Sequence, residues 1–144
     1  MASNKGMYRE IKTALENQII DHLVAEGEKI DVYSVPYQNI AVFPAVALEL
    51  IARRKPKKGV GVKQLILDMV VWVYVDIMDA EDAEDETLRL TEIVENAIEK
   101  DKQLGGASHY LTIDEQAEFG TVESGEASFL YGAKLRVQVT KRFN

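Results

Sequence analysis

One long segment, "KQLILDMVVWVYVDIM" (residues 63–78), constrains the fold more than any other part of the sequence. Every second position in it is aliphatic: Leu65, Leu67, Met69, Val71, Val73, Val75 and Ile77. The positions between them mix apolar residues with Gln64, Asp68 and Asp76. Side chains alternate between the two faces of a strand, so this pattern predicts a long strand with one fully buried face and one partly covered face.

A second strand with the same period precedes it. In "PAVALELIAR", one face is expected to carry Val46, Leu48, Leu50 and Ala52. Pro56, Gly59 and Gly61 lie between the two strands, and these residue types favour turns. The two strands are therefore predicted to form one long β-hairpin, with residues 53–63 at its tip.

The other predicted elements surround this hairpin. Apolar residues at helical spacing predict a helix from about Lys5 to Ala25, closed by Gly27. A second helix is predicted from the acids near residue 79 to "KQLGG", with Gly105 suited to a left-handed C-cap. A short strand, "KIDVYSV", follows the first helix, and "SHYLTIDEQAEFGTV" and "ASFLYGAKLRVQVTKRF" predict a final strand pair. This order predicts one α+β domain over residues 1–144: a mainly antiparallel sheet with a long central hairpin and two helices packed on one face.

Two concentrations of opposite charge stand out in a chain of net charge −7. The basic stretch, residues 53–63, has no acid and contains Arg53, Arg54, Lys55, Lys57, Lys58 and Lys63. The acidic run, residues 79–86, contains Asp79, Glu81, Asp82, Glu84, Asp85 and Glu86. The basic stretch is either a solvated hairpin tip that discourages edge aggregation or a docking arm. Because it lacks aromatic residues for stacking on bases, an acidic protein surface is the better partner, and another copy of this chain offers one in its acidic run.

The sequence offers no site for catalysis, metal or cofactor. His22 and His109, its only histidines, lack partners at ligand or triad spacing. The chain has no cysteine, and its acidic run lacks the alternating ligands and central glycine of a calcium loop. The longest apolar run, Met69 to Val75, is far shorter than the ~20 residues of a membrane helix. We therefore expect a soluble, intracellular, non-enzymatic protein without a cofactor, and its negative excess argues against general nucleic-acid binding.

The order of elements, with three stretches of sequence, resembles the tail terminator (tail completion) proteins of tailed bacteriophages. These stretches are the N-terminal helix and its strand, then "FPAVALEL" leading to "LILDMVVWVYV", and "IEKDKQLGG" followed by a strand pair ending in "AKLRVQVTKRF". The resemblance covers nearly the whole chain. It implies a virion protein that forms a hexameric ring on the head-proximal end of the tail tube, stops tube polymerisation and contacts head-completion (stopper) proteins. It also implies assembly in the host cytoplasm and DNA that passes through the lumen without specific binding.

Within that resemblance, the hairpin loop and strand edges are expected to make ring and tube contacts, which places the basic stretch at an interface. Glu115, Glu118 and Glu123 are candidates to face the lumen, because they cluster near one predicted hairpin. Three other readings stay open: a different phage neck or minor tail protein, a cytoplasmic ligand-binding or regulatory α+β domain, and an enzyme. The last lacks the residues that catalysis requires.

Overall fold

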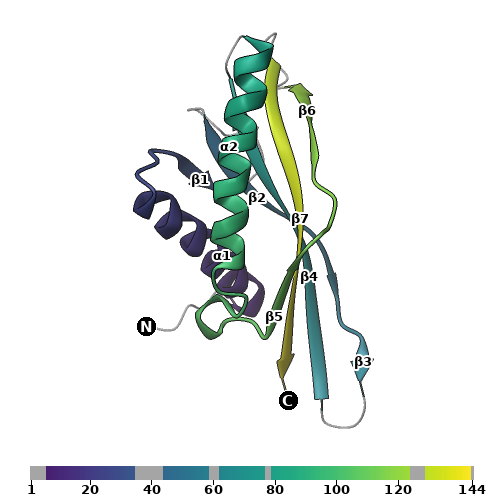
Figure 1. Ribbon diagram of the computed structural model, residues 1–144. Helices are drawn as coiled ribbons and strands as arrows, with labels where there is room; N and C mark the ends of the chain where they lie inside the picture. Colours follow the sequence, from purple (N-terminus) through teal and green to yellow (C-terminus); the bar gives the residue numbers. More distant parts are fainter. Residues whose placement is uncertain (1–5, 35–43, 59–61, 77–78, 124–128, 144) are drawn as a thin grey trace.

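The computed structural model describes residues 6–34, 44–58, 62–76, 79–123 and 129–143 of the chain. These residues form two α-helices, a short 3-10 turn and seven strands, which confirms the predicted α+β fold (Figure 1). In chain order they are α1 (Gly6–Ala25), β1 (Asp31–Tyr33), β2 (Ala45–Arg54), β3 (Lys57–Lys58), β4 (Val62–Val75), α2 (Ala80–Glu99), η2 (Leu104–Gly106), β5 (Tyr110–Ile113), β6 (Glu118–Glu123) and β7 (Phe129–Phe143).

The strands make one sheet in the order β1-β2-β4-β7-β5. β2 and β4 pair antiparallel over most of their length, which confirms the predicted hairpin, and β3 continues the β2 side of it along β4. β7 pairs antiparallel with β4, and on its other side with β5 and then β6. Among the described strands, only β1 pairs parallel to its neighbour, β2. β5 and β6 therefore form one sheet edge in two pieces.

The core lies between this sheet and the two helices, which cover the same face (Figure 1). On β4 the described odd positions from Leu65 to Val75 are at most 1% exposed, as the period of two predicts. Four residues of each helix pack against them, all at most 1% exposed: Ile11, Leu15, Ile19, Leu23, Leu90, Val94, Ala97 and Ile98. None of the described helices covers the opposite face, which we call the helix-free face.

A β-bulge in β2 changes which of its residues share a face. Leu50 lies opposite Met69, but the next paired residue is Ala52, opposite Asp68, so Ile51 is the extra residue. Directly opposed residues share a face. Ala52 therefore lies on the helix-free face, and the prediction that it shares a face with Leu50 is wrong. Regular alternation in the sequence could not reveal the extra residue, because only the partner strand defines it.

Gly27 closes α1 as predicted, with a left-handed φ of 76°, whereas α2 follows the predicted chemistry at one end only. Asp79 is the N-cap, and its Oδ1 accepts a hydrogen bond of 3.0 Å from the backbone N–H of Asp82. At the other end, Lys100 is the C-cap in a right-handed conformation. Gly105 does adopt a left-handed φ of 67°, but within the following 3-10 turn, so its predicted position as the C-cap of α2 is wrong.

The side chain of Gln18 ties α1 to the end of α2. Its Nε2 lies 2.9 Å from the carbonyl oxygen of Ala97, 3.1 Å from that of Ile98 and 3.1 Å from that of Asp101. The last carbonyls of a helix have no partner within the helix. One amide group on α1 therefore bonds carbonyls at and just beyond the end of α2 and joins the two helices.

We expect Gln18→Glu to lower the free energy of unfolding at pH 7 by about 1–3 kcal/mol, because a carboxylate would face carbonyl oxygens in place of a donor. The loss should shrink as the pH falls from 7 toward about 4, because a carboxyl group that faces carbonyl oxygens has a raised pKa, protonates above the pKa of an exposed glutamate and then donates again. Urea unfolding at both pH values measures this. Asn17→Asp is the matched control, since Asn17 is an exposed neighbour on the same helix. Equal effects of the two substitutions would contradict the role of Gln18.

Candidate functional site

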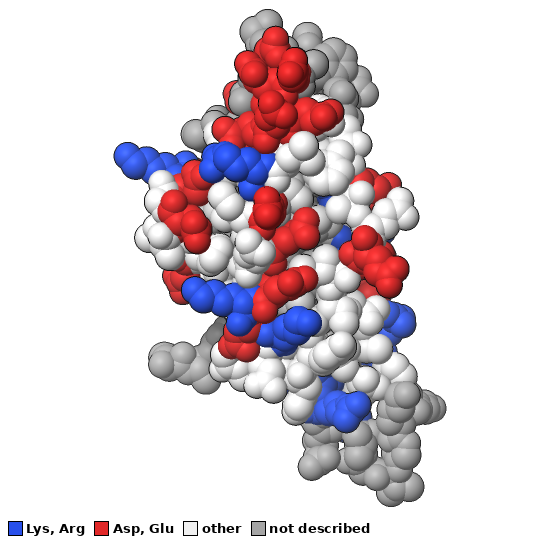
Figure 2. Space-filling view, in the orientation of Figure 1, with Lys and Arg blue, Asp and Glu red and all other residues white. Residues whose placement is uncertain are grey.

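The acidic run and the basic stretch lie at opposite ends of the molecule. The acidic run is the start of α2, which follows the end of β4, whereas the basic stretch lies around the start of β4 (Figure 1). β4 has 14 residues and so spans about 45 Å. In Figure 2, acidic side chains gather over the start of α2, and a small basic patch lies toward the opposite end. We call these the acidic end and the basic end.

Some side chains of the acidic end are used within the chain. Asp79 caps the helix. Glu84 accepts a hydrogen bond of 3.4 Å from the hydroxyl of Tyr131, and this neighbour contributes, after burial, to a raised pKa of the phenol. Glu86 accepts a hydrogen bond of 2.6 Å from Nε of Arg89. Within the described part of the chain the exposed carboxylates of Glu81, Asp82 and Asp85 have no partner, so they are available to another molecule.

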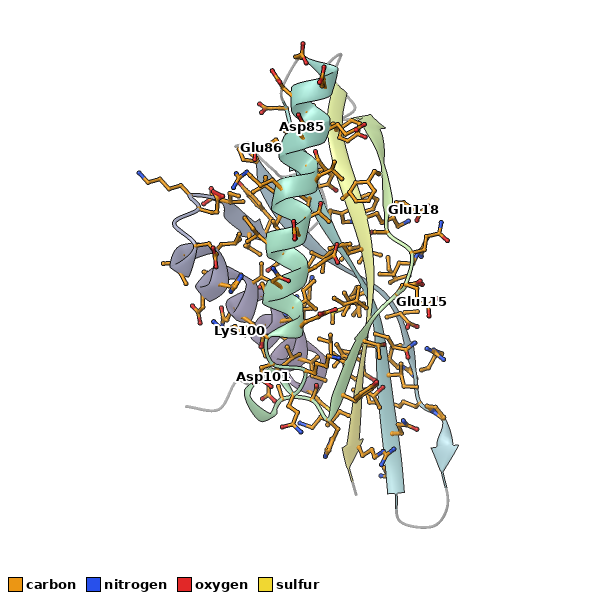
Figure 3. All side chains as sticks on the ribbon, viewed as in Figure 1. Asp85, Glu86, Lys100, Asp101, Glu115 and Glu118 are labelled. Atoms are coloured by element: carbon orange, nitrogen blue, oxygen red, sulfur yellow. The ribbon has the colours of Figure 1, made fainter. Side chains whose placement is uncertain are left out.

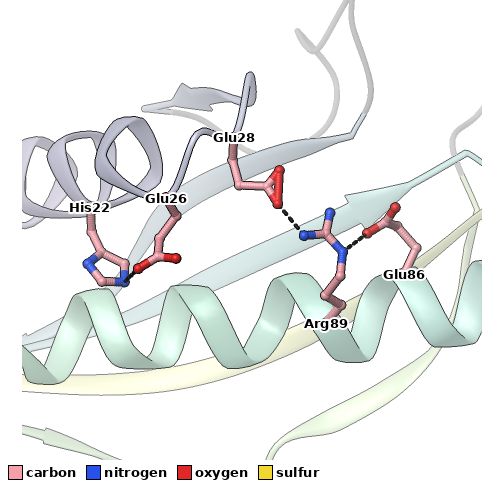
Figure 4. A network of polar contacts seen from close by, with 5 residues as sticks. All are labelled: His22, Glu26, Glu28, Glu86 and Arg89. Carbon is pink, nitrogen blue, oxygen red and sulfur yellow. Dashed lines mark hydrogen bonds and ion pairs between the residues drawn. The ribbon is translucent and has the colours of Figure 1, made fainter.

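Arg89 links the acidic end to the N-terminal helix region (Figure 4). Its guanidinium bonds Glu86 on one side and Glu28, which follows α1, on the other. These two carboxylates raise the pKa of the guanidinium further. His22 lies nearby, with Nε2 3.8 Å from a carboxylate oxygen of Glu26. The network holds the start of α2 against the end of α1, so the acidic end has a fixed position.

The basic end contains both engaged and unengaged cations. Arg54 donates from Nε to Asp68 at 3.2 Å, and the ammonium of Lys55 lies 5.7 Å from the centre of the Tyr8 ring. Arg53 and Lys63 are exposed and have no partner among the described residues. Lys57 and Lys58 form β3, while residues 59–61 lie outside the described part. The free charges at the two ends are therefore opposite in sign.

The helix-free face carries an ordered aromatic and charged cluster. The rings of Trp72 and Tyr74 stack with centroids 5.8 Å apart and planes at 8°. Nε1 of Trp72 donates to Glu49 at 3.0 Å, and the ammonium of Lys134 lies 5.3 Å from the centre of the indole. Trp72 is thus held in one orientation on a surface without a covering helix.

Below that cluster, Asp68 anchors a second polar group. Its carboxylate accepts a hydrogen bond from Arg54, and Oδ1 also accepts one of 3.1 Å from Nε2 of Gln138. Burial by itself would raise the pKa of this carboxyl, but the two hydrogen bonds outweigh it and the pKa is lowered. Beside it lies a shallow hollow of about 340 Å³, bounded by Ile51 on β2 and by Asp114 and Arg136 across the sheet. Most cations of this face thus have an acid nearby.

The candidate lumen acids lie away from both helices. Figure 3 shows Glu115 and Glu118 on β6 and the loop before it. A carboxylate oxygen of Glu118 is 3.4 Å from Nη2 of Arg136, an exposed ion pair of little energetic worth, and Glu115 is exposed. The backbone of Glu123 ends β6. The structure therefore brings these acids to one sheet edge.

The described residues hold no group of three His, Asp or Glu arranged for a metal ion. Nδ1 of His109 accepts a hydrogen bond of 3.0 Å from the backbone N–H of Arg142, so this histidine joins the start of β5 to β7. Lys12, only 8% exposed, donates to the carbonyl of Ser34; burial, aided by Arg9, lowers the pKa of its ammonium. The helices in the described ranges are too short or too polar to cross a membrane.

Comparison with known proteins yields a weak structural likeness. No protein-family model and no curated protein matches the chain. Among solved structures, a chain from the "Virion of native gene transfer agent (GTA) particle" aligns with a TM-score of 0.45 and 13% identity, over 90% of this chain and 93% of that one. This degree of similarity does not assign a family. The functional argument therefore rests on the chain's own residues.

Proposed function

We propose that this chain is a virion structural protein of the tail terminator type. In this role it forms a hexameric ring on the head-proximal end of a phage tail tube, ends tube polymerisation and joins the tail to head-completion proteins. The observation that supports it best is the separation of free charges: Glu81, Asp82 and Asp85 at one end, Arg53 and Lys63 at the other. A molecule built this way is complementary to copies of itself.

The contact that this separation favours is heterologous. The basic end of one copy meets the acidic end of the next, so the pair still has one unused end of each sign. Such a contact repeats until a ring closes. Opposite potentials also speed the encounter and oppose like-with-like pairing. The fixed position of the acidic end, held by Arg89, suits this use, because an ordered surface loses less freedom on binding.

The proposal requires no catalytic group and no cofactor. Its partners are other copies of the chain, the tail tube protein and a stopper protein, and DNA passes through the ring. A net charge of −7 suits a channel in which the phosphate backbone must slide without binding. Its place is the tail or neck of the virion, after assembly in the host cytoplasm.

The test is the length of tubes polymerised from the matching tube protein, with and without this chain, by negative-stain electron microscopy. We expect shorter, length-limited tubes that carry an extra ring on one end. Long, uncapped tubes in the presence of the chain would refute the terminator role. An extra ring found only on complete necks, and never on free tubes, would support another neck or minor tail position instead.

A further inference from the structure

Among the described strands the sheet has two open edges, and both expose apolar side chains. β1 covers the outer side of β2 only at Ala45–Ala47, so no described strand pairs with β2 beyond that point. There Leu50 is 40% and Ile51 53% exposed. On the other edge, no described strand pairs with the outer side of β6, where Phe119 is 44% exposed. Open edges of this kind are sites at which another chain adds a strand.

The two edges carry opposite charge. Residues 50–58, along β2 and β3, include five basic residues and no acid. Residues 114–123, along β6 and the loop before it, include four acids and no base. Among the exposed members, Arg53 and Lys55 lie on the first edge, and Glu115 and Glu118 on the second. The β5 part of the second edge lacks this complementarity to β2 of another copy, since residues 110–113 carry no charge.

The strand directions suit a ladder between copies. β2 runs antiparallel to β4, β4 to β7, and β7 to β6. β2 and β6 therefore run in opposite directions. Two copies that stand side by side in the same orientation would bring β2 of one against β6 of the other as an antiparallel pair, the arrangement that extends a sheet most readily.

The same end of the molecule holds β6 and the acidic run. Thr121 of β6 lies opposite Tyr131 on β7, and the hydroxyl of Tyr131 bonds Glu84 at 3.4 Å. In the register that sets Leu50 of one copy opposite Phe119 of the next, an antiparallel ladder sets Arg53 and Arg54 opposite residues 116 and 115. The basic edge of one copy therefore meets the acids of the β6 edge, and the acidic run lies beyond the paired residues.

We propose that a second copy of this chain pairs its β6 edge, antiparallel, with the exposed outer side of β2, so that the sheet continues from copy to copy. This rests on the proposed self-assembly and names the backbone surface that makes it. Glu115 and Glu118 then meet a neighbour's basic residues instead of facing a lumen.

The chain has no cysteine, which permits a direct test by crosslinking. Leu50→Cys and Phe119→Cys are placed in one full-length chain, on the helix-covered side of β2 and β6, where their paired residues Met69 and Ala133 lie. Within one copy β4 and β7 separate these positions by about 14 Å across the sheet, with roughly 13 Å more along it. This exceeds the ~7 Å between Cα atoms that a disulfide spans.

Oxidation of the double variant is expected to give a ladder of covalent dimers, trimers and larger species on a non-reducing gel. Each single-cysteine variant should give none, because a heterologous contact never places position 50 beside position 50. A double variant that stays monomeric, or single variants that dimerise equally well, would overturn the edge contact. Circular dichroism of each variant verifies that the fold is retained.

A second measurement places a lysine at an exposed apolar position, once in the sheet and once in the helix layer as a control. Phe119→Lys places a cation on the acidic edge and is expected to abolish assembly, measured as molecular mass by light scattering after gel filtration. Ile20→Lys is the matched control, since Ile20 is 37% exposed on α1, and should assemble like the wild type. Full assembly of Phe119→Lys would overturn the inference. If the wild type caps tubes but the double variant gives no ladder, the edge contact alone is refuted, whereas a ladder with uncapped tubes refutes the terminator role alone.

Discussion

Self-assembly and tube capping are expected to disappear when four charges at the basic end are reversed together. The variant carries Arg53→Glu, Arg54→Glu, Lys57→Glu and Lys58→Glu. It would set like charges against the acidic end of the neighbouring copy, and juxtaposed like charges cost several kcal/mol in an interface. We expect the mass of a single chain at concentrations where the wild type assembles, and tubes of uncontrolled length. Light scattering and electron microscopy measure the two effects.

Because the reversal also makes the chain more acidic overall, it needs a control of equal net charge. Glu at four exposed basic positions away from the basic end provides one: Arg9, Lys29, Lys100 and Lys102. This control should assemble like the wild type. Adding Glu81→Lys and Asp85→Lys to the reversed variant should restore part of the assembly, since both partners then change sign. Assembly by the reversed variant, or its loss in the control, would refute the charge pairing.

The largest effect on stability is expected from Leu90→Ala. Leu90 is fully buried between α2 and the sheet, so its truncation removes apolar contacts and leaves a cavity. The expected loss is about 2–5 kcal/mol, a large share of the ~5–15 kcal/mol by which a domain is usually stable. The midpoint of urea unfolding, with an unchanged slope, measures it.

Leu88→Ala is the control for this substitution. The two leucines lie two residues apart on α2, but Leu88 is 47% exposed. Its truncation should change the free energy of unfolding by no more than about 0.5 kcal/mol. Equal losses at the two positions would show that α2 does not pack as described.

Local patterns in the sequence were sufficient for the main elements. The aliphatic odd positions of β4 are buried because period two is a property of any strand that packs one face against a core. The spacing of Leu15, Ile19 and Leu23 similarly predicted the buried stripe of α1. The acids near residue 79 predicted an acidic N-cap for α2, and Asp79 supplies it. In each case the physical cause lies within a few residues of the chain.

The acids near β6 were harder to interpret. Their sequence placed Glu115, Glu118 and Glu123 near a hairpin, but it did not show that β6 is an open edge. That depends on which strand lies beside which, and β6 pairs with β7 alone among the described strands. Edge exposure is a property of sheet order, so no window of sequence contains it.

By itself the sequence determined the element order, the α+β class, the buried face of β4 and the presence of two opposite charge concentrations. The tertiary structure alone decided that these concentrations lie at opposite ends, and which of their charges remain free. It also decided the bulge that moves Ala52 to the helix-free face, and the termination of α2 before Gly105. The reason is that burial patterns repeat along one strand or helix, whereas register, pairing and ion-pair partners such as Arg54 with Asp68 or Arg89 with Glu28 join residues far apart in the chain.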